Sequence, residues 1–304
     1  MSAPDVSAIL VNYNAGPDLG RALQSIADDL TDQRWEAVVV DNASSDGSAD
    51  VVADFAPHAR LVRNVENVGF ARAVNQGLAA TSAPLVLIMN PDCRLVAGAF
   101  VALRKGLDES PSCAAAGPRI LNPDGSVQGS ARGDPDMFTG LFGRTTLLRR
   151  VLPDLAVSKR NVIGDPSAAD GRSSMAVDWV SGACLLARRA ALLQVHGFDE
   201  RYFLYWEDAD LCRRLRADGY QVRYVPGATA IHRVGHSSRT ARAAAIRAFH
   251  ESAYLYYATH VASTGVLKRL LARMLLALRC RLLLRAARAD SQSPTPNVQT
   301  TAGH

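Results

Sequence analysis

Acidic side chains stand at three points of the sequence where they can take part in chemistry. Asp41 ends one apolar run, Asp92 closes the turn 90–92 after another, and Glu207 and Asp208 open a helical pattern. A carboxylate at a strand end can accept hydrogen bonds from a base or a ribose. An acid at the tip of a central strand can hold a divalent cation and, through it, a diphosphate. Crowded carboxylates such as Glu207 and Asp208 suit a general base.

Each of these acids also has a plain structural interpretation. Asp41 precedes Asp46 and Ser48, which are typical residues at the start of a helix. The Asn-Pro-Asp segment 90–92 is a common turn, and acids at 207–210 complement the dipole of a helix N-terminus. Taken alone, each motif leaves both interpretations open.

One histidine stands where it can add to these acids. His232 follows the apolar run 222–225, which predicts a strand that leads toward the same edge as the acids. Imidazole is a metal ligand or a donor to phosphate. A single histidine is more often structural, so the sequence alone does not decide its role.

Strands, polar loops and helices alternate through the first ninety residues or so. The strands are short and continuously apolar, which is typical of a mainly parallel sheet covered by helices on both faces. In such sheets the ligand sits beyond the carboxyl ends of the strands. The polar loops 12–16, 41–47 and 90–92 are therefore expected to gather at one edge. The predicted strands are 6–11, 37–40, 61–62 and 85–89. The predicted helices are 18–30, a helix that follows Gly47 and extends to about Phe55, and 71–80.

The second half predicts a strand over 177–187, a helix over 207–218 and a helical region over 241–289. That last region carries an apolar stripe, formed by Leu267, Leu270, Leu271, Met274, Leu278 and Leu282. The basic residues that lie away from the stripe are Lys268, Arg269, Arg273 and Arg279.

Charge is concentrated at the C-terminal end. The net charge is +5, yet residues 239–289 hold ten Lys or Arg and one acid, Glu251, which leaves −4 for the remainder. The excess indicates an anionic partner, either a membrane or a nucleic acid. A packing helix or a dimer contact with a solvated basic face is the alternative. The polar segment 291–304 predicts a disordered tail.

Composition and missing motifs exclude several classes of protein. Hydrophobic residues make up 48% and charged residues 21%, which are globular proportions. The absence of GxGxxG, Walker and GxSxG motifs argues against a dinucleotide oxidoreductase, a P-loop NTPase and an α/β-hydrolase. Five cysteines without a CxxC pair predict free thiols and no zinc site. We find no secretory signal and no apolar run long enough for a transmembrane span.

Taken in order, the motifs resemble glycosyltransferase family 2, the inverting enzymes of the GT-A fold. The match extends over roughly residues 6–236. The subset formed by Asn-Pro-Asp, Glu-Asp-Ala-Asp-Leu-Cys and Gly-His-Ser is most similar to bacterial rhamnosyltransferases, including those that add L-rhamnose to polyprenyl-diphosphate-linked GlcNAc. Galactofuranosyltransferases share the architecture. The segments that carry the resemblance are 8–14, 39–47, 64–77, 90–92, 179–186, 197–203 and 207–208.

The resemblance implies an α/β GT-A fold, Rossmann-like with a mainly parallel sheet and helices on both faces, plus C-terminal basic helices. Residues 1–238 would form the catalytic domain. Within it, 1–117 would bind the nucleotide sugar, and 118–238 would bind the acceptor and carry the catalytic residues. Outside the resemblance, the charge and apolar pattern of residues 239–289 favour basic helices at a membrane surface, and the polar composition of 290–304 favours a disordered tail.

The resemblance also implies roles for single residues. Asp208 would be the general base, with Glu207 orienting it or binding the acceptor, and Asp92 with His232 would hold Mg²⁺ or Mn²⁺. One departure matters: the first acid of the family's DxD motif is Asn90 here, so the metal role passes only to Asp92. The donor-binding residues would be Val11, Tyr13, Asp41, Gly69, Arg72, Asn75, Asn90 and Asp92. The acceptor-binding residues would be Trp179, Gly182, Tyr205 and Trp206.

The implied activity is inverting transfer of a sugar from a nucleoside-diphosphate donor to a lipid-linked or cell-envelope glycan. The expected donor is dTDP-L-rhamnose and the expected acceptor polyprenyl-diphosphate-GlcNAc. Two alternatives stay open: a galactofuranosyl or other hexosyl transferase that uses a UDP-sugar, and a non-catalytic module that binds nucleotide sugar or a lipid surface. We expect a cytoplasmic enzyme, peripheral on the inner face of the bacterial plasma membrane, with no nucleic-acid partner. A homo-oligomer stays open.

Overall fold

The first half of the chain forms a parallel sheet of four strands, as its alternating pattern predicts. The computed structural model describes residues 3–134, 174–233, 242–263 and 265–292. The strands lie in the order β3-β2-β1-β4 and all run the same way. They are β1 (Val6–Asn12), β2 (Trp35–Asp41), β3 (Ala59–Arg63) and β4 (Leu85–Met89), connected through α1 (Asp18–Asp29), the 3₁₀-helix η1 (Ser48–Phe55) and α2 (Phe70–Ala79).

The second half extends this sheet in the order β4-β10-β6-β11-β5. Strand β10 runs antiparallel to both β4 and β6, β5 and β8 run antiparallel to β11, and β6 and β11 are parallel. A separate pair joins β7 to β9. The elements are β5 (Cys93–Leu95), α3 (Ala99–Asp108), β6 (Cys113–Leu121), β7 (Ala131–Arg132), β8 (Met175–Ala176), β9 (Trp179–Val180), β10 (Cys184–Arg188), α7 (Arg189–Gln194), α8 (Glu207–Ala217) and β11 (Gln221–His232).

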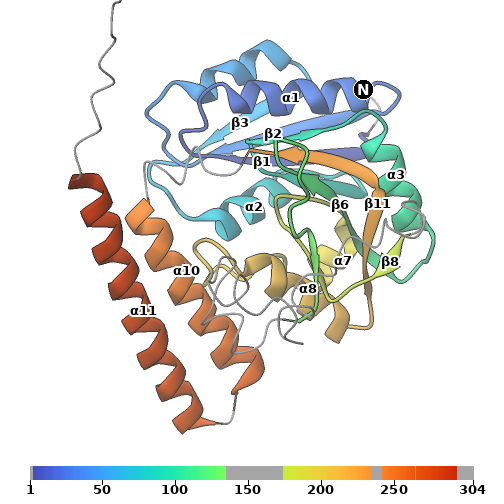
Figure 1. The fold of residues 1–304 in the computed structure, drawn as a ribbon. Coiled ribbons are helices and arrows are strands. Elements are labelled where there is room, and N and C mark those ends of the chain that lie inside the picture. The colour runs from blue at the N-terminus through green and yellow to red at the C-terminus, as the bar shows by residue number, and fades with distance from the viewer. Residues whose placement is uncertain (1–2, 135–173, 234–241, 264, 293–304) are drawn as a thin grey trace, which may run out of the picture.

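Helices cover both faces of the sheet, so the molecule has three layers (Figure 1). All seven residues of β1 are buried. Side chains alternate between the faces of a strand. Val6, Ala8 and Leu10 therefore join one core with α1, η1 and α3. Ile9 and Val11 join the other core, with α2, α7 and α8. The central strands read as continuous apolar runs because both of their faces are buried.

Two predicted strands differ from the structure in extent. The run 177–187 is interrupted at 181–183, between β9 and β10. The interruption turns the chain toward α8, because the Gly182 amide donates to the Asp208 carboxylate instead of to a neighbouring strand. The run at 222–225 is the first part of a longer strand, β11, and it ends at a register shift between Val225 and Thr229.

The region predicted as helical over 241–289 is a hairpin of two helices. It consists of α10 (Arg242–Tyr256), a π-helical turn η3 (Tyr257–Val261) and α11 (Val266–Gln292). The chain turns at Gly265, whose amide donates to the Ala262 carbonyl. Glycine is a poor former of helix interiors, which accounts for the break. Helix α11 also includes residues 290–292 of the predicted tail, and the remainder of the tail lies outside the described residues.

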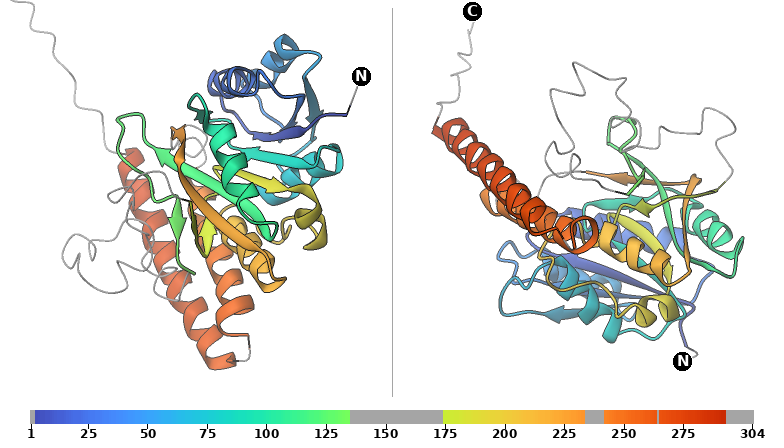
Figure 2. Two further views of the ribbon diagram at one scale, coloured as in Figure 1. Left: turned by 90° about the vertical axis from the view of Figure 1, so that its right-hand side faces the viewer. Right: turned by 90° about the horizontal axis from the view of Figure 1, so that it is seen from below.

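The two sides of α11 have opposite surroundings. Ala272 and Leu276 are buried, while Arg273 and Arg279 lie over the rings of Tyr254 and Phe249 on α10. These two arginines therefore face α10, whereas the side chains of the apolar stripe are exposed. Helix α11 itself lies on the outside of the molecule (Figures 1 and 2). The exposed side chains include Leu267 (79%), Leu270 (55%), Leu271 (49%), Met274 (69%), Leu278 (55%) and Leu282 (55%). Within the described residues, no helix has the length and apolar character to span a membrane.

Candidate active site

The ends of β1 and β2 hold a buried polar cluster around Asp41. The two strands are in register so that Asn12 lies beside Asp41. The Asn12 side-chain amide donates to Asp41 Oδ1 at 2.8 Å and to Ser48 Oγ at 2.9 Å. The Ser44 amide donates to Asp41 Oδ2 at 3.2 Å. Asp41 is 2% exposed, and these bonds hold its carboxylate in one orientation at the strand ends.

The helix-cap interpretation applies to Asp46 rather than to Asp41. The Ser48 amide and hydroxyl at the start of η1 both donate to Asp46 Oδ1, and the Gly16 amide donates to its other oxygen. Asp41 instead accepts the Ser44 amide in the loop before η1. Asn12 was not predicted as a site residue, although a polar residue that ends a wholly apolar strand was the available signal.

A second amide network fixes the loop that follows β3. Asn42 is 2% exposed, and its side-chain amide donates to the Gly69 carbonyl at 3.2 Å. Asn64 donates to Asn42 Oδ1 and exchanges hydrogen bonds with Gln76 on α2. The segment that leads into α2 is thereby anchored to the end of β2. None of these amides was predicted as a site residue.

Gly69 stands where only glycine fits. Its φ of +88° is left-handed, and a Cβ there would lie 2.7 Å from the Phe203 carbonyl oxygen. The same carbonyl accepts the Phe70 amide at 2.7 Å. The start of α2 is thus pressed against the segment that precedes α8, which joins the predicted donor and acceptor sides.

Asn75 and Arg72 lie on the side of α2 that faces that segment. The Asn75 amide donates to the Phe198 carbonyl and accepts from the Phe198 N–H, both at 2.9 Å. Asn75 is therefore engaged within the protein, which favours a clamping role over the predicted donor contact. The Arg72 side chain is 59% exposed and lies 3.6 Å from a Glu200 carboxylate oxygen.

Asn90, Asp92 and His232 converge from two strand ends. His232 Nε2 lies 3.2 Å from Asp92 Oδ1 and 3.5 Å from Asn90 Nδ2. His232 Nδ1 lies 3.0 Å from Gln128 Oε1, and the Gln128 amide donates to the His232 carbonyl. When His232 donates its Nδ1–H to Gln128, the Nε2 lone pair faces the Asp92 carboxylate. Metal-ligating histidines commonly have this arrangement, in which the other ring nitrogen donates to a neighbouring oxygen.

Asp92 and His232 together fit a divalent cation whose remaining coordination positions are filled by a bound substrate. Asp92 and His232 side chains are each 13% exposed, so one side of the pair stays open. Across the described part of the chain, no group of three or more His, Cys, Asp and Glu side chains forms a closed metal cage. Hydrogen bonding with Cys184 and burial hold the pKa of Cys93 well above its usual range, so this thiol stays protonated.

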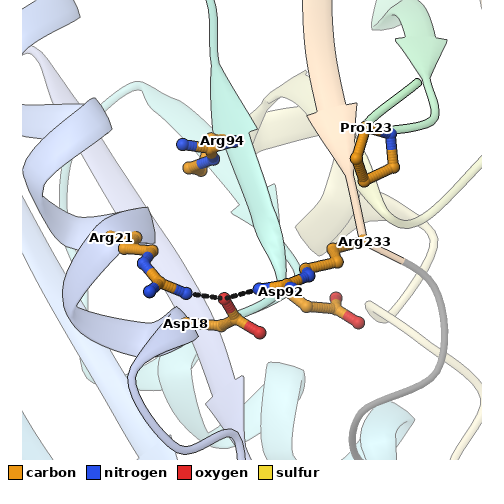
Figure 3. Close-up of a pocket in the computed structure, with 6 residues that line it drawn as sticks. All are labelled: Asp18, Arg21, Asp92, Arg94, Pro123 and Arg233. Atoms are coloured by element: carbon orange, nitrogen blue, oxygen red, sulfur yellow. Dashed lines mark hydrogen bonds and ion pairs between the residues drawn. The ribbon is translucent and has the colours of Figure 1, made fainter. Parts of the chain in front are cut away.

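A pocket of about 170 Å³ adjoins Asp92 (Figure 3). Its cationic residues are Arg21 on α1, Arg94 on β5 and Arg233 at the end of β11. Arg21 and Arg233 both lie against Asp18, at 2.8 and 3.7 Å. Three guanidinium groups against two carboxylates leave the lining net positive, which favours an anionic ligand beside Asp92. These arginines were not predicted as site residues, because they are far apart along the chain.

The predicted general base lies at the first turn of α8. Asp208 is half-buried, and its Oδ2 accepts the Gly182 N–H at 2.9 Å. A Cβ at Gly182 would lie 3.2 Å from Asp208 Cβ, so the close approach requires a small residue. The neighbouring Ala183 carbonyl accepts the Asn90 amide at 2.9 Å. The segment 181–183 therefore brings Asp208 and the Asn90–Asp92 turn to one edge of the sheet.

The turn before α8 is strained. Tyr205 and Trp206 both have φ of 70°, which side chains other than glycine rarely adopt. Each such residue costs about 1–3 kcal/mol, and such strain clusters at functional sites. Trp206 packs against Phe249 and Tyr256, which favours packing over contact with a sugar. Trp179, also predicted on the acceptor side, is 7% exposed and donates its indole N–H to the Gly133 carbonyl.

The remaining acids of α8 point into the protein. Glu207 is 6% exposed and Asp210 is 1% exposed. Asp210 pairs with Arg214 at 2.7 Å and also with His260 at 2.7 Å. Arg213 donates to the Tyr256 hydroxyl and the His260 carbonyl.

Family comparisons place most of the chain among glycosyl transferases. The family described as glycosyl transferase family 2 matches residues 7–160, and glycosyl transferase family group 2 matches residues 155–277. Together these matches span the sheet, α8 and the start of α11.

Two curated relatives carry rhamnosyltransferase names. The chain is 34% identical over 293 residues to the N-acetylglucosaminyl-diphospho-decaprenol L-rhamnosyltransferase of Mycobacterium tuberculosis, and the match covers 92% of each protein. It is 41% identical over 86 residues to the rhamnosyltransferase WbbL of Escherichia coli, covering 28% of this chain and 33% of the relative.

Two solved structures share the fold. GalNAc-T7 in complex with UDP, GalNAc and Mn²⁺ superposes with a TM-score of 0.58 at 15% identity, over 76% of this chain and 44% of the other. The mannosyltransferase PcManGT of Pyrobaculum calidifontis, in complex with GDP-Man and Mn²⁺, superposes with a TM-score of 0.53 at 20% identity, over 97% and 78%. At these identities the likeness concerns the GT-A fold, which the sequence predicted.

Proposed function

Because the chain belongs to glycosyl transferase family 2, we propose that it transfers L-rhamnose from dTDP-L-rhamnose to a polyprenyl-diphosphate-linked GlcNAc. That it is a glycosyltransferase follows from the family. The observation that carries the finer assignment is the 34% identity over 92% of both chains to a rhamnosyltransferase that is named for a GlcNAc-diphospho-decaprenol acceptor. Asp208, Gly182 and the Asn90–Asp92 turn lie together at one edge of the sheet, and this arrangement supports the proposal of sugar transfer at that edge.

In the proposed reaction the acceptor hydroxyl attacks the anomeric carbon of the donor. Its oxygen forms the new glycosidic bond while the bond from that carbon to the diphosphate oxygen breaks, so the configuration inverts. Asp208 accepts the proton of the attacking hydroxyl. The Gly182 N–H keeps one carboxylate oxygen of Asp208 in place at 2.9 Å. Direct displacement needs no covalent intermediate on the protein.

The donor would lie across the strand ends. Asp41 would accept hydrogen bonds from the base or the ribose, since its carboxylate is fixed at the end of β2. Val11 and Tyr13 flank this position on β1 and the loop after it. Asp92 and His232, with Asn90 beside them, would hold Mg²⁺ or Mn²⁺. A bound divalent cation offsets the charge that develops on the departing diphosphate. Arg94 and Arg233 add positive potential there.

The assignment is tested with a panel of donors. Purified full-length protein is incubated with Mg²⁺ or Mn²⁺, a short polyprenyl-diphosphate-GlcNAc and, in turn, UDP-, GDP- and dTDP-sugars, and product mass is recorded. We expect a gain of one deoxyhexose from dTDP-rhamnose. Transfer of a hexose from a UDP-sugar alone would overturn the rhamnose assignment. Donor binding without turnover on any acceptor would instead support a binding module.

Asp41 is predicted to act on donor affinity. Asp41→Asn keeps the size of the side chain but removes one acceptor oxygen, so the KM for the donor is expected to rise about tenfold. The kcat at saturating donor should change little, because the substitution lies away from the reacting bonds. Steady-state kinetics with varied donor make the measurement, and Asp50→Asn on η1 is the matched control. An unchanged donor KM would refute this role.

We also propose that α11 lies on the anionic membrane that holds the acceptor. Its exposed stripe is apolar, and the hairpin region 239–289 carries ten basic residues and one acid. A basic amphipathic helix of this kind binds at the interface of anionic bilayers. The charge of the region complements a lipid surface, whereas a second copy of the same basic helix would repel it.

Vesicle sedimentation tests this placement. The double substitution Leu267→Ser and Met274→Ser is expected to lower partition onto vesicles of phosphatidylglycerol and phosphatidylcholine by about tenfold or more. The reason is that two large apolar side chains that would be buried in the bilayer are removed. Serine at both Val65 and Leu193, exposed apolar residues of the body, is the control. Unchanged partition, with a change in oligomeric mass by light scattering, would assign the stripe to a second copy instead.

A further inference from the structure

The turn directly before Asp208, at Tyr205 and Trp206, has a backbone conformation that needs support from neighbouring elements. Tyr205 and Trp206 are consecutive left-handed residues directly before Glu207 and Asp208. No glycine relieves this turn, and such a conformation persists only where the surroundings determine it. The contacts that determine it come from the C-terminal hairpin, a region far away in the sequence.

Helix α10 packs against this turn along one face. The ring centroid of Phe249 lies 6.0 Å from that of Tyr205 and 5.8 Å from that of Trp206. One turn later, the Ser252 hydroxyl donates to the Leu204 carbonyl at 3.0 Å. Another turn on, the Tyr256 ring lies 5.4 Å from Trp206. Positions three and four apart lie on one side of a helix, so α10 supports the whole turn.

A second attachment follows where α10 becomes π-helical. The wider η3 turn, closed by the Ala262 amide on the Tyr257 carbonyl, brings His260 to Asp210 of α8. His260 Nε2 lies 2.7 Å from Asp210 Oδ1, and Arg213 donates to the His260 carbonyl at 3.2 Å. The Asp210 amide in turn donates to the Trp206 carbonyl. π-helical turns of this kind occur frequently at functional sites.

We infer that Phe249 and His260 of the C-terminal hairpin are positioning residues for Asp208. This inference rests on the proposed function of Asp208 as general base. Phe249 holds the turn before Asp208, and His260 holds Asp210 two residues after it. Arg279 of α11 lies over the Phe249 ring at 5.8 Å and donates to His250. A lipid surface bound to α11 would thus be connected to the turn before Asp208 through the side chains of Arg279 and Phe249.

The inference predicts a particular kinetic signature. A general base works only within hydrogen-bond reach of the proton it takes, and a displacement of about 1 Å can cost about 10²-fold in rate. Loosening the turn should therefore lower kcat. The KM for the donor should hold, because the Asp41 carboxylate at the end of β2 is held by Asn12 and Ser44, which do not belong to the hairpin.

The test compares Phe249→Leu with Tyr254→Leu in the full-length protein. Both remove an aromatic ring from α10, but the Tyr254 ring meets Arg273 of α11 rather than the catalytic turn. We expect Phe249→Leu to lower kcat about tenfold or more, with donor KM within about twofold. Tyr254→Leu should keep kcat within about twofold. Thermal unfolding of each variant reports on folding.

His260 supplies an independent measurement. His260→Ala is expected to lower kcat, and His260→Gln to restore most of it, because the glutamine amide can still donate to Asp210. Equal kcat losses in Phe249→Leu and Tyr254→Leu, in proportion to lost stability, would overturn the inference. So would wild-type kcat in both Phe249→Leu and His260→Ala. Turnover near the wild-type rate in Asp208→Asn would refute the role of Asp208 as general base. That result would overturn the proposed function, and it is distinguishable from a failure of the present inference.

Discussion

Asp208→Asn is expected to lower kcat by about 10²–10⁴-fold and to leave donor affinity nearly unchanged. The asparagine side chain can still accept the Gly182 N–H, so the local structure should persist. What it loses is the capacity to take the proton of the acceptor hydroxyl, a contribution of about that size in general base catalysis. The measurement is single-turnover transfer to the lipid-linked acceptor, with donor binding followed separately by calorimetry.

Asp218→Asn is the matched control for this experiment. Asp218 lies at the opposite end of α8 and contacts Gln194, away from the strand ends. Its substitution should leave kcat within about twofold of wild type. Turnover by Asp208→Asn at a rate near that of Asp218→Asn would show that another group takes the proton.

Asp92→Asn is expected to lower transfer by about 10²-fold or more at a fixed Mg²⁺ or Mn²⁺ concentration. A cation at this position supplies several kcal/mol of charge stabilisation, and 1.36 kcal/mol is a factor of ten in rate. With asparagine there, a bound cation would keep the imidazole of His232 as a ligand but would lose the carboxylate of Asp92. Part of the activity should return when the metal concentration is raised, and this metal titration is the measurement.

The chain offers a close control for the Asp92 experiment. A second Asn-Pro-Asp segment lies at 122–124, and its Asp124 accepts hydrogen bonds from Ser126 in an exposed turn. Asp124→Asn should leave the metal dependence unchanged. If Asp92→Asn has the metal dependence of wild type, the cation binds elsewhere.

The same two segments show how far the sequence could lead. Both have the composition of a turn and both directly follow a strand, β4 and β6, so neither composition nor a preceding strand alone identifies the metal-binding candidate. Position after an apolar strand predicted correctly that Asp41 and Asp92 lie at one edge of the sheet, because parallel strands present their carboxyl ends together. The order of the motifs likewise predicted the GT-A fold and the family, which the comparisons confirm.

Contacts between distant segments account for what the sequence could not give. The break at Gly182 depends on Asp208, twenty-six residues later, and no local pattern encodes it. Gln128 holds His232 across 104 residues. The sequence showed the apolar stripe of α11, but it did not show which side of the helix would pack on α10. In the structure Arg273 and Arg279 face α10 through cation–π contacts with Tyr254 and Phe249, and the leucines of the stripe are exposed.

Burial also separates residues that sequence alone treats alike. Trp179, Tyr205 and Trp206 were grouped as acceptor contacts. The structure buries Trp179 and packs Trp206 on Phe249 and Tyr256. Aromatic residues near a site serve packing as readily as binding, and only their surroundings distinguish the two.

The anomeric configuration of the product tests the central claim most directly. Transfer from β-configured dTDP-L-rhamnose to polyprenyl-diphosphate-GlcNAc is carried out with wild-type protein and a divalent cation, and the linkage is determined by NMR. Direct displacement with Asp208 as base predicts an α-linked rhamnose. A β-linked product would mean that configuration is retained, which a single displacement at this site cannot produce.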